Sequence, residues 1–308
     1  MKRVGIIGSG NVGANSAFFI AENRIASVTL VDAKDGLSTG KALDLSEAGP
    51  IRRYDTEIRG DNDIGNIRDS DIVVIAAGRV RAPDQNRDDL YLDNAQLAAG
   101  ICEDIKRLAP NAVVINVAEP VDMITLLVQK TLGFDRTRVL GVGGLLSSTR
   151  LRFLVSHALG VSPREVTGMV VGPHRPCMVI LRDTVRVSGI PAEKLLTPEQ
   201  FNAIVDRVRK AGDTILHMAQ RSTSYYAPSA AVAALVEAIV RDTKTILPVS
   251  IRLQGEYGLN DIAVSVPARI GASGVDQVVS VEMNAAEKKE FQDAADELSA
   301  SLKRVTGS

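Results

Sequence analysis

Acid/base and cationic side chains stand in two loop-like segments of this chain. His174 lies in Gly172-Pro173-His174-Arg175-Pro176, between two β-rich runs. An imidazole titrates near neutrality, so it can give and take a proton at physiological pH. The segment from Arg79 to Leu90 is rich in arginine, and guanidinium groups bind carboxylates in a planar, two-pronged geometry. Taken singly, such features are more often a structural histidine and a solvated loop.

A glycine turn near the start of the chain predicts a dinucleotide site. Gly8-Ser9-Gly10-Asn11-Val12-Gly13 follows an apolar run and opens a helical pattern. The first glycine permits a tight turn, the second lets a diphosphate approach the backbone, and the third lets the helix pack on the sheet. Asp32 ends the next apolar run, where a carboxylate binds ribose hydroxyls and repels a 2′-phosphate. Strand, helix and acid together favour NAD over a merely structural turn.

The first half of the sequence alternates short apolar runs with helical patterns. The expected strands are Val4–Ile7, Val28–Val31, Ile72–Ala76, Val113–Val117 and Val139–Val142, and the expected helices are Asn11–Asn23, Leu37–Ala48, Asp88–Leu108 and Val121–Leu132. Strand residues that are apolar throughout, rather than alternating, are typical of a parallel sheet covered on both faces. The pattern predicts an α/β protein with a doubly wound Rossmann sheet, and an NAD-binding domain over residues 1–142.

The second half has a different pattern. Val166–Val171 and Val179–Val187 are β-rich, and Thr197-Pro198-Glu199-Gln200 has the residues of a capping box that opens a helix. Asn284 begins a similar pattern, for a helix that ends near Lys303. We therefore expect an α+β substrate domain over residues 143–308. No flexible linker separates the halves, so a cleft between closely packed domains is expected.

Composition excludes several classes of protein. The formal net charge is -1, which does not indicate a nucleic-acid or membrane-surface partner. Cys102 and Cys177 are too far apart in the sequence for a disulfide framework or a zinc site, so no metal is expected. No apolar run reaches the roughly 20 residues that span a bilayer. The start Met1-Lys2-Arg3-Val4 leads directly into a strand pattern, which favours a cytoplasmic protein.

Several motifs together resemble the malate/lactate dehydrogenase family, nearer its lactate-dehydrogenase-like malate branch. They are the arginine-rich loop, Gly40-Lys41-Ala42-Leu43-Asp44-Leu45, Tyr225-Tyr226-Ala227-Pro228-Ser229-Ala230 and Val266-Pro267, so the similarity runs nearly end to end. The resemblance implies reduction of a small anionic 2-oxo acid with NADH, or oxidation of the 2-hydroxy acid with NAD. It also implies a homodimer or homotetramer, since relatives form dimer contacts where residues 37–48 lie.

The resemblance assigns roles to particular residues. His174 matches the acid/base histidine, Arg150 the clamp for the C1 carboxylate, and Arg87 the arginine that polarises the reacting carbonyl. Arg81 matches the arginine that malate dehydrogenases use for the distal carboxylate, which favours oxaloacetate, and Ser224 would line that pocket. The cofactor contacts that the family pattern implies are Gly8, Gly10, Asn11, Val12, Gly13, Asp32, Ala77, Gly78, Asn94 and Val117.

Two positions near the expected reacting carbon depart from the family pattern. Glu119, before Pro120, stands where the family has a substrate-binding asparagine. A carboxylate about 4 Å from an anionic substrate costs roughly 4 kcal/mol at an effective dielectric near 20, so Glu119 must be protonated, turned away, or paired with an arginine such as Arg150. Ser147 stands where the family has the aspartate that orients the histidine, and a serine carries no charge. The neighbours of His174 also differ: Pro173, Arg175, Pro176 and Cys177.

Three hypotheses follow from this mixture of matches and departures. The leading one is an NAD-dependent 2-hydroxy-acid dehydrogenase acting on malate and oxaloacetate. The second is a dehydrogenase for a different 2-hydroxy or 2-oxo acid, since Glu119 could bind a cationic group or take over the job of the missing aspartate. The third is an NAD-binding protein with weak or no catalysis, because Ser147 lacks the charge that supports His174.

Overall fold

The computed structural model describes residues 1–79, 86–219 and 223–307. Its first half forms the parallel part of a sheet, in the order β3-β2-β1-β4-β5-β6. The strands are β1 (Arg3–Ile7), β2 (Ser27–Val31), β3 (Ile58–Asp61), β4 (Ile72–Ile75), β5 (Val113–Asn116) and β6 (Val139–Gly141), and the helices are α1 (Asn11–Glu22), α2 (Leu37–Arg52), α3 (Arg87–Leu108) and α4 (Val121–Leu132). This is the strand order of a doubly wound dinucleotide-binding sheet, so the predicted fold class is confirmed.

Burial explains why the apolar runs form central strands. Every residue of β4 and β5 is buried, as expected for strands that have helices on both faces of the sheet. The sequence did not predict β3, whose residues Ile-Arg-Gly-Asp are half-buried or exposed. It pairs with β2 alone, at the edge of the sheet, where no apolar run is needed.

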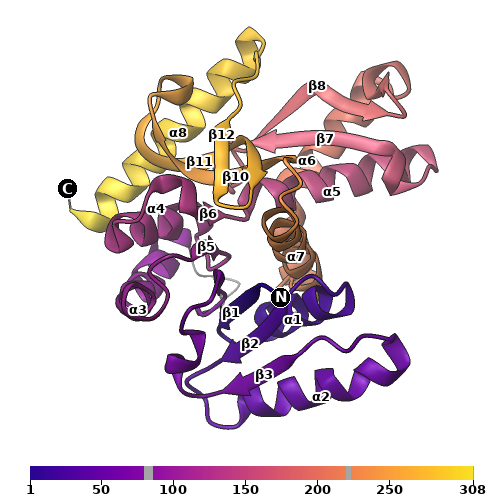
Figure 1. Ribbon diagram of the computed structural model, residues 1–308. Coiled ribbons are helices and arrows are strands. Elements are labelled where there is room, and N and C mark those ends of the chain that lie inside the picture. Colours follow the sequence, from indigo (N-terminus) through magenta and orange to yellow (C-terminus); the bar gives the residue numbers. More distant parts are fainter. Residues whose placement is uncertain (80–85, 220–222, 308) are drawn as a thin grey trace.

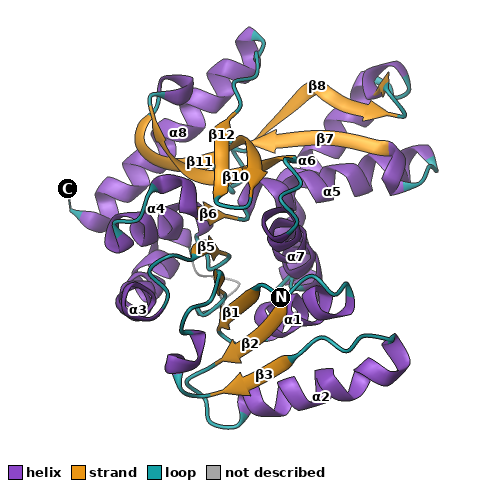
Figure 2. Cartoon of the chain, viewed as in Figure 1, coloured by secondary structure: helices purple, strands orange, loops and turns teal. Residues whose placement is uncertain are grey.

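The second half both extends the first sheet and builds a smaller one. Its elements are α5 (Gly143–Leu159), β7 (Val166–Val171), β8 (Val179–Val187), β9 (Ile190–Pro191), α6 (Pro198–Ala219), α7 (Tyr226–Val240), β10 (Ile246–Gln254), β11 (Asn260–Gly271), β12 (Gly274–Val278) and α8 (Ala285–Thr306). β10 pairs antiparallel with β6, so the large sheet has nine strands and continues into the second half, while β7, β8 and β9 form a separate sheet (Figure 2).

Both predicted capping boxes are present. The Thr197 hydroxyl accepts the backbone N–H of Gln200 at 3.3 Å, and the Gln200 side chain accepts the N–H of Thr197 at 2.9 Å. Asn284 and Glu287 exchange the same pair of bonds at the start of α8. In each case two donors of the first helical turn, which have no partner inside the helix, are satisfied locally.

Helix α7 joins the two halves. Figure 1 shows it standing between α1 and the elements of the second half. The Ser229 hydroxyl in α7 lies 2.8 Å from the carbonyl of Val12, in the first turn of α1. One apolar core includes residues of β1, β4, α7, β10 and α8, and a second lies between α5, α6, β7 and β8. Across the described ranges no helix is both long and apolar enough to cross a membrane.

Candidate active site

The glycine turn has the geometry that a bound diphosphate requires. Gly8 has a φ of 101°, which only glycine adopts readily, and a Cβ built on Gly13 would lie 1.9 Å from the Gly8 carbonyl oxygen. A Cβ on Gly10 would meet no protein atom within 4 Å. Gly8 and Gly13 are therefore required by the fold itself, while Gly10 keeps one side of the backbone accessible. These residues fit the diphosphate of NAD at the N-terminus of α1.

Asp32 lies beside this turn, just beyond the end of β2. Its Oδ2 accepts the backbone N–H of Ser9 at 2.7 Å, and its Oδ1 accepts that of Lys34 at 2.9 Å. These two bonds fix the orientation of the carboxylate. A carboxylate oxygen can accept more than one hydrogen bond, so Asp32 can also bind ribose hydroxyls.

A cavity of about 180 Å³ lies between the two halves. It brings together residues that the sequence placed in the cofactor site and residues that it placed in the substrate site. These residues are Val12, Gly78, Val117, Glu119, Arg150, His174 and Ser224. Val12 of the glycine turn, Arg150 and His174 therefore line the same cavity.

Asn94 connects two loops at the edge of this cavity. Its side-chain oxygen accepts the N–H of Arg79 at 2.7 Å, and its side-chain nitrogen donates to the carbonyl of Glu119 at 2.7 Å. Asn94 thus fixes the segments that follow β4 and β5 relative to each other. Ala77 lies under the turn, because a Cβ on Gly8 would come within 2.4 Å of its backbone nitrogen. The direct cofactor contacts of Asn94 and Ala77 stay predictions.

His174 lies in the loop between β7 and β8 and is 9% exposed. Its Nδ1 is 3.0 Å from the Ser147 hydroxyl. Ser147 therefore contacts the ring at the position where the family pattern has an aspartate. Its backbone N–H donates to Asp122 Oδ2 at 2.6 Å, and Asp122 Oδ1 accepts from the Ser250 hydroxyl at 2.7 Å. The histidine is therefore held through its backbone as well as through its ring.

Glu119 faces the other side of the imidazole. Its Oε1 lies 3.6 Å from His174 Nε2, while its Oε2 accepts the backbone N–H of Val121 at 3.1 Å. The carboxylate is thus on the side of the ring opposite to Ser147, and it does not replace the missing aspartate at Nδ1. It stands instead next to Nε2, the other ring nitrogen. The described contacts of Glu119 are therefore with His174 and the backbone of Val121, and its expected pairing with an arginine such as Arg150 stays a prediction.

Asp122, in the first turn of α4, is a buried acid that the sequence analysis did not single out. Burial raises the pKa of its carboxyl to about 6, and the nearby charge of Glu119 acts in the same direction. The hydrogen bonds from Ser250 and from the His174 backbone, and the charge of Arg175, lower that pKa but do not offset burial. An acid within the apolar run of α4 was the signal available in the sequence.

The predicted arginines differ in how they are placed. Arg150, on α5, lines the cavity as expected. Arg81 lies outside the described residues. Arg87 is the first residue of α3, but its side chain is not among those that the structure describes. Arg209 on α6 also lines the cavity, although it belongs to no motif in the sequence. Its Nη2 pairs with Glu290 Oε2 at 2.8 Å and its Nε donates to the carbonyl of Met178 at 3.2 Å.

Comparison with known proteins agrees with this geometry. Residues 2–141 match the lactate/malate dehydrogenase NAD binding domain, and residues 145–307 match the lactate/malate dehydrogenase alpha/beta C-terminal domain. The malate dehydrogenase of Roseiflexus sp. (strain RS-1) is 40% identical over 300 residues, which is 97% of each chain. The solved malate dehydrogenase of Salinibacter ruber is 37% identical with a TM-score of 0.93, and the match covers 99% of this chain and 100% of that one.

A solved complex extends the comparison to ligands. The lactate dehydrogenase of Cryptosporidium parvum, complexed with lactic acid and nicotinamide adenine dinucleotide, is 30% identical with a TM-score of 0.95, over 100% of this chain and 98% of that one. This chain belongs to the lactate/malate dehydrogenase family. It is an NAD-dependent dehydrogenase of the type that acts on a CH–OH group, and its cofactor is NAD.

Proposed function

We propose that this protein is a malate dehydrogenase, which interconverts malate and oxaloacetate with NAD. The observation that carries the proposal is the single cavity lined by His174 and Arg150 together with Val12 and Gly78 of the cofactor side. An acid/base group and a carboxylate-binding group next to the dinucleotide turn are what oxidation of a 2-hydroxy acid requires. The proposal is also supported by the relatives named malate dehydrogenase.

The proposed chemistry divides the reaction between the chain and its cofactor. NAD, when bound, supplies the acceptor for the hydride that leaves C2 of the hydroxy acid. His174 removes the hydroxyl proton at Nε2, while the Ser147 hydroxyl accepts the Nδ1–H and keeps the ring in the required tautomer. Arg150 binds the C1 carboxylate, and Glu119 stabilises the imidazolium that forms next to it.

Further assignments belong to the same proposal. Arg87 would polarise the carbonyl in the reduction direction, Arg81 would bind the distal carboxylate, and Ser224 would line the pocket for it. The resemblance supports these roles, as it supports a homodimer or homotetramer. A cytoplasmic location was favoured by the sequence pattern and stays a prediction.

A substrate panel tests the function. Purified protein should oxidise NADH with oxaloacetate faster than with pyruvate, because oxaloacetate has a second carboxylate for the role that the resemblance implies for Arg81. His174→Asn should lower kcat about 100- to 10 000-fold while leaving NADH affinity within about twofold, because only the proton transfer is lost. Binding of NADH without turnover of any 2-oxo acid would instead support an NAD-binding protein without catalysis.

The second candidate, a different 2-oxo acid, is favoured by one observation, the carboxylate of Glu119 at 3.6 Å from His174 Nε2. A substrate with a cationic group near its reacting carbon would be attracted there, whereas oxaloacetate is repelled. The same panel, repeated with Glu119→Asn, separates the two candidates. If malate is the substrate, the variant should lower turnover of oxaloacetate, because the imidazolium loses the neighbouring carboxylate; if a cationic oxo acid is the substrate, activity on that acid should fall while oxaloacetate turnover rises.

A further inference from the structure

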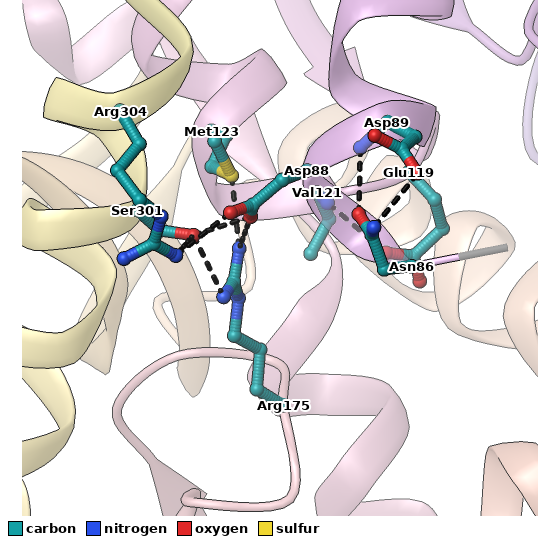
Figure 3. Close-up of polar contacts among 9 residues, drawn as sticks. All are labelled: Asn86, Asp88, Asp89, Glu119, Val121, Met123, Arg175, Ser301 and Arg304. Atoms are coloured by element: carbon teal, nitrogen blue, oxygen red, sulfur yellow. Dashed lines mark hydrogen bonds and ion pairs between the residues drawn. The ribbon is translucent and has the colours of Figure 1, made fainter.

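Arg175, directly after the proposed acid/base histidine, is almost completely buried. It is 8% exposed, and its guanidinium points towards Asp88, Met123 and Ser301 (Figure 3). Its Nη2 lies 3.4 Å from Asp88 Oδ1 on α3 and 3.0 Å from Met123 Sδ on α4. Its Nη1 donates to the Ser301 hydroxyl on α8 at 3.2 Å. One side chain thus links the histidine loop to three helices.

Asp88 is the common acceptor of this cluster. Besides Arg175, it accepts a hydrogen bond from the Ser301 hydroxyl, and its Oδ2 lies 2.7 Å from Arg304 Nη2 (Figure 3). Its carboxyl is partly buried, and its pKa is held below the ordinary range by Ser301, Arg304 and Arg175, against the opposing effect of burial. Asp88 therefore stays ionised and provides a counter-ion for a buried cation.

Asp88 and Arg175 are each adjacent in the sequence to a proposed site residue. Asp88 directly follows Arg87, the first residue of α3, and Arg175 directly follows His174. Arg87 and His174, which both have proposed roles in the reaction, are thus each one position from a member of a largely buried ion pair. The pair joins the start of α3 to the loop between β7 and β8, which are far apart in the sequence.

We propose that Arg175 is a positioning residue, which sets the placement of His174 relative to the first turn of α3 through its ion pair with Asp88. This rests on the proposed function. His174 here has the uncharged Ser147 at Nδ1, so its ring is held less firmly than by a carboxylate. Two contacts restrain the backbone around it: the N–H of His174 bonded to Asp122, and the side chain of Arg175 bonded to Asp88. The second contact supplies rigidity that the ring lacks.

The experiment compares Arg175→Met and Asp88→Asn with the matched control Lys303→Gln, which removes an exposed cation from the last turn of α8. Misplacement of a reacting group by about 1 Å can cost about 100-fold in rate, so Arg175→Met should lower kcat for the oxo acid by about 10- to 100-fold. KM for the oxo acid and the affinity for NADH should change by less than about threefold. The control should keep kcat within about twofold of the wild type.

A second readout does not depend on turnover. Amide hydrogen exchange in residues 86–92 and 172–178 should quicken together in Arg175→Met, and in the same way in Asp88→Asn, because each change releases both segments. The effects of the two substitutions on kcat should be strongly non-additive, since either one breaks the same contact. If the wild type turned over no oxo acid, the proposed function would fail, but coupled exchange of the two segments would still report whether Arg175 joins them.

Arg175→Lys tests whether a lower kcat in Arg175→Met is caused only by loss of the folded state. Lysine keeps the positive charge beside Asp88 but cannot reach Asp88 and Ser301 together, because it lacks the planar fork of arginine. It should restore the stability lost in Arg175→Met while leaving kcat reduced. Wild-type kcat and unchanged exchange in both Arg175 variants would overturn the proposal, as would loss of thermal stability alone with normal kcat in the folded protein.

Discussion

At the scale of single residues, the unusual feature of the site is its distribution of charge around His174. Glu119 faces one ring nitrogen, Ser147 the other, and the buried carboxyl of Asp122 holds the backbone N–H. A protonated His174 would therefore have the partly exposed carboxylate of Glu119 beside Nε2, while the buried Asp122 contacts its backbone. The imidazolium can be stabilised in this way without an aspartate at Nδ1, although the partner at Nδ1 still decides which tautomer the neutral ring adopts.

The raised pKa of Asp122 predicts a pH dependence of stability. The pKa is about 6 in the fold and ordinarily 3.8, so the folded state binds more protons than the unfolded state between these values. The free energy of unfolding should therefore fall as the pH rises through this window, by up to about 3 kcal/mol, since one unit is worth about 1.4 kcal/mol. Asp122→Asn cannot ionise, and it can still accept from the His174 N–H and donate to Ser250.

Urea unfolding at pH 4.5 and pH 7 measures this effect. The free energy of unfolding of Asp122→Asn, measured relative to that of the wild type, should be higher at pH 7 than at pH 4.5. The exposed Asp55→Asn serves as the control, and its stability should follow that of the wild type at both pH values. Wild-type and Asp122→Asn curves with the same pH dependence would contradict a raised pKa at this position.

At the scale of elements, the sequence was most informative where an element is buried on all sides. β1, β4 and β5 were predicted nearly to their ends, because a strand covered by helices must be apolar throughout. β3 and β10–β12 were missed. β3 is an edge strand, whereas β10 and β11 are buried over most of their length but have Pro248, Ser250, Ser265 and Pro267 within their apolar runs, which weakens the pattern. α7 was not predicted as a helix, although a motif at its start was noted, since its apolar residues surround the helix instead of forming one stripe.

The site shows the same difference between what a local pattern predicts and what packing decides. Motifs could locate four of its residues, His174, Arg150, Ser147 and Glu119. That Glu119 and Ser147 contact opposite nitrogens of the ring depends on how the segment after β5 packs against α5. The ion pair of Arg175 could not be predicted, because Asp88 is distant in the sequence. The division into residues 1–142 and 143–308 stays a prediction.

The glycine turn predicts two different outcomes for one kind of substitution. Gly10→Ala should leave the free energy of unfolding within about 1 kcal/mol, because its Cβ meets no protein atom within 4 Å, but it should weaken NADH binding about tenfold or more. Gly13→Ala should destabilise the fold by about 1–3 kcal/mol or more, because its Cβ would lie 1.9 Å from the Gly8 oxygen.

Chemical denaturation and NADH titration by fluorescence separate these effects. Gly100→Ala, in the exposed middle of α3 with open space around its Cβ, is the control. It should raise stability by about 0.5–1 kcal/mol and leave NADH affinity unchanged. Equal losses of stability in Gly10→Ala and Gly13→Ala would refute the separate roles assigned to the two glycines.

At the scale of the whole molecule, the two halves share one sheet and one of the two cores. β10 is the neighbour of β6 through the pairing of Ser250 with Gly141, and α7 packs against α1 beneath the glycine turn. Figure 1 shows that the second half folds back over the first at α7. Each half buries part of its apolar surface against the other in the shared core, which differs from two domains joined by a linker.

This continuity predicts that the protein unfolds in a single transition. NADH at about 100 times its Kd should stabilise the fold by about 2.7 kcal/mol, and the gain should appear equally in the second half, although the dinucleotide turn lies in the first. Calorimetry should show one peak that moves as a whole, and hydrogen exchange in β11 should slow together with that in β4. Residues 1–142 expressed alone should show no cooperative transition, because β6 loses β10 and α1 loses α7. Two separate peaks, only one of them shifted by NADH, would mean that the halves are independent domains despite their common sheet.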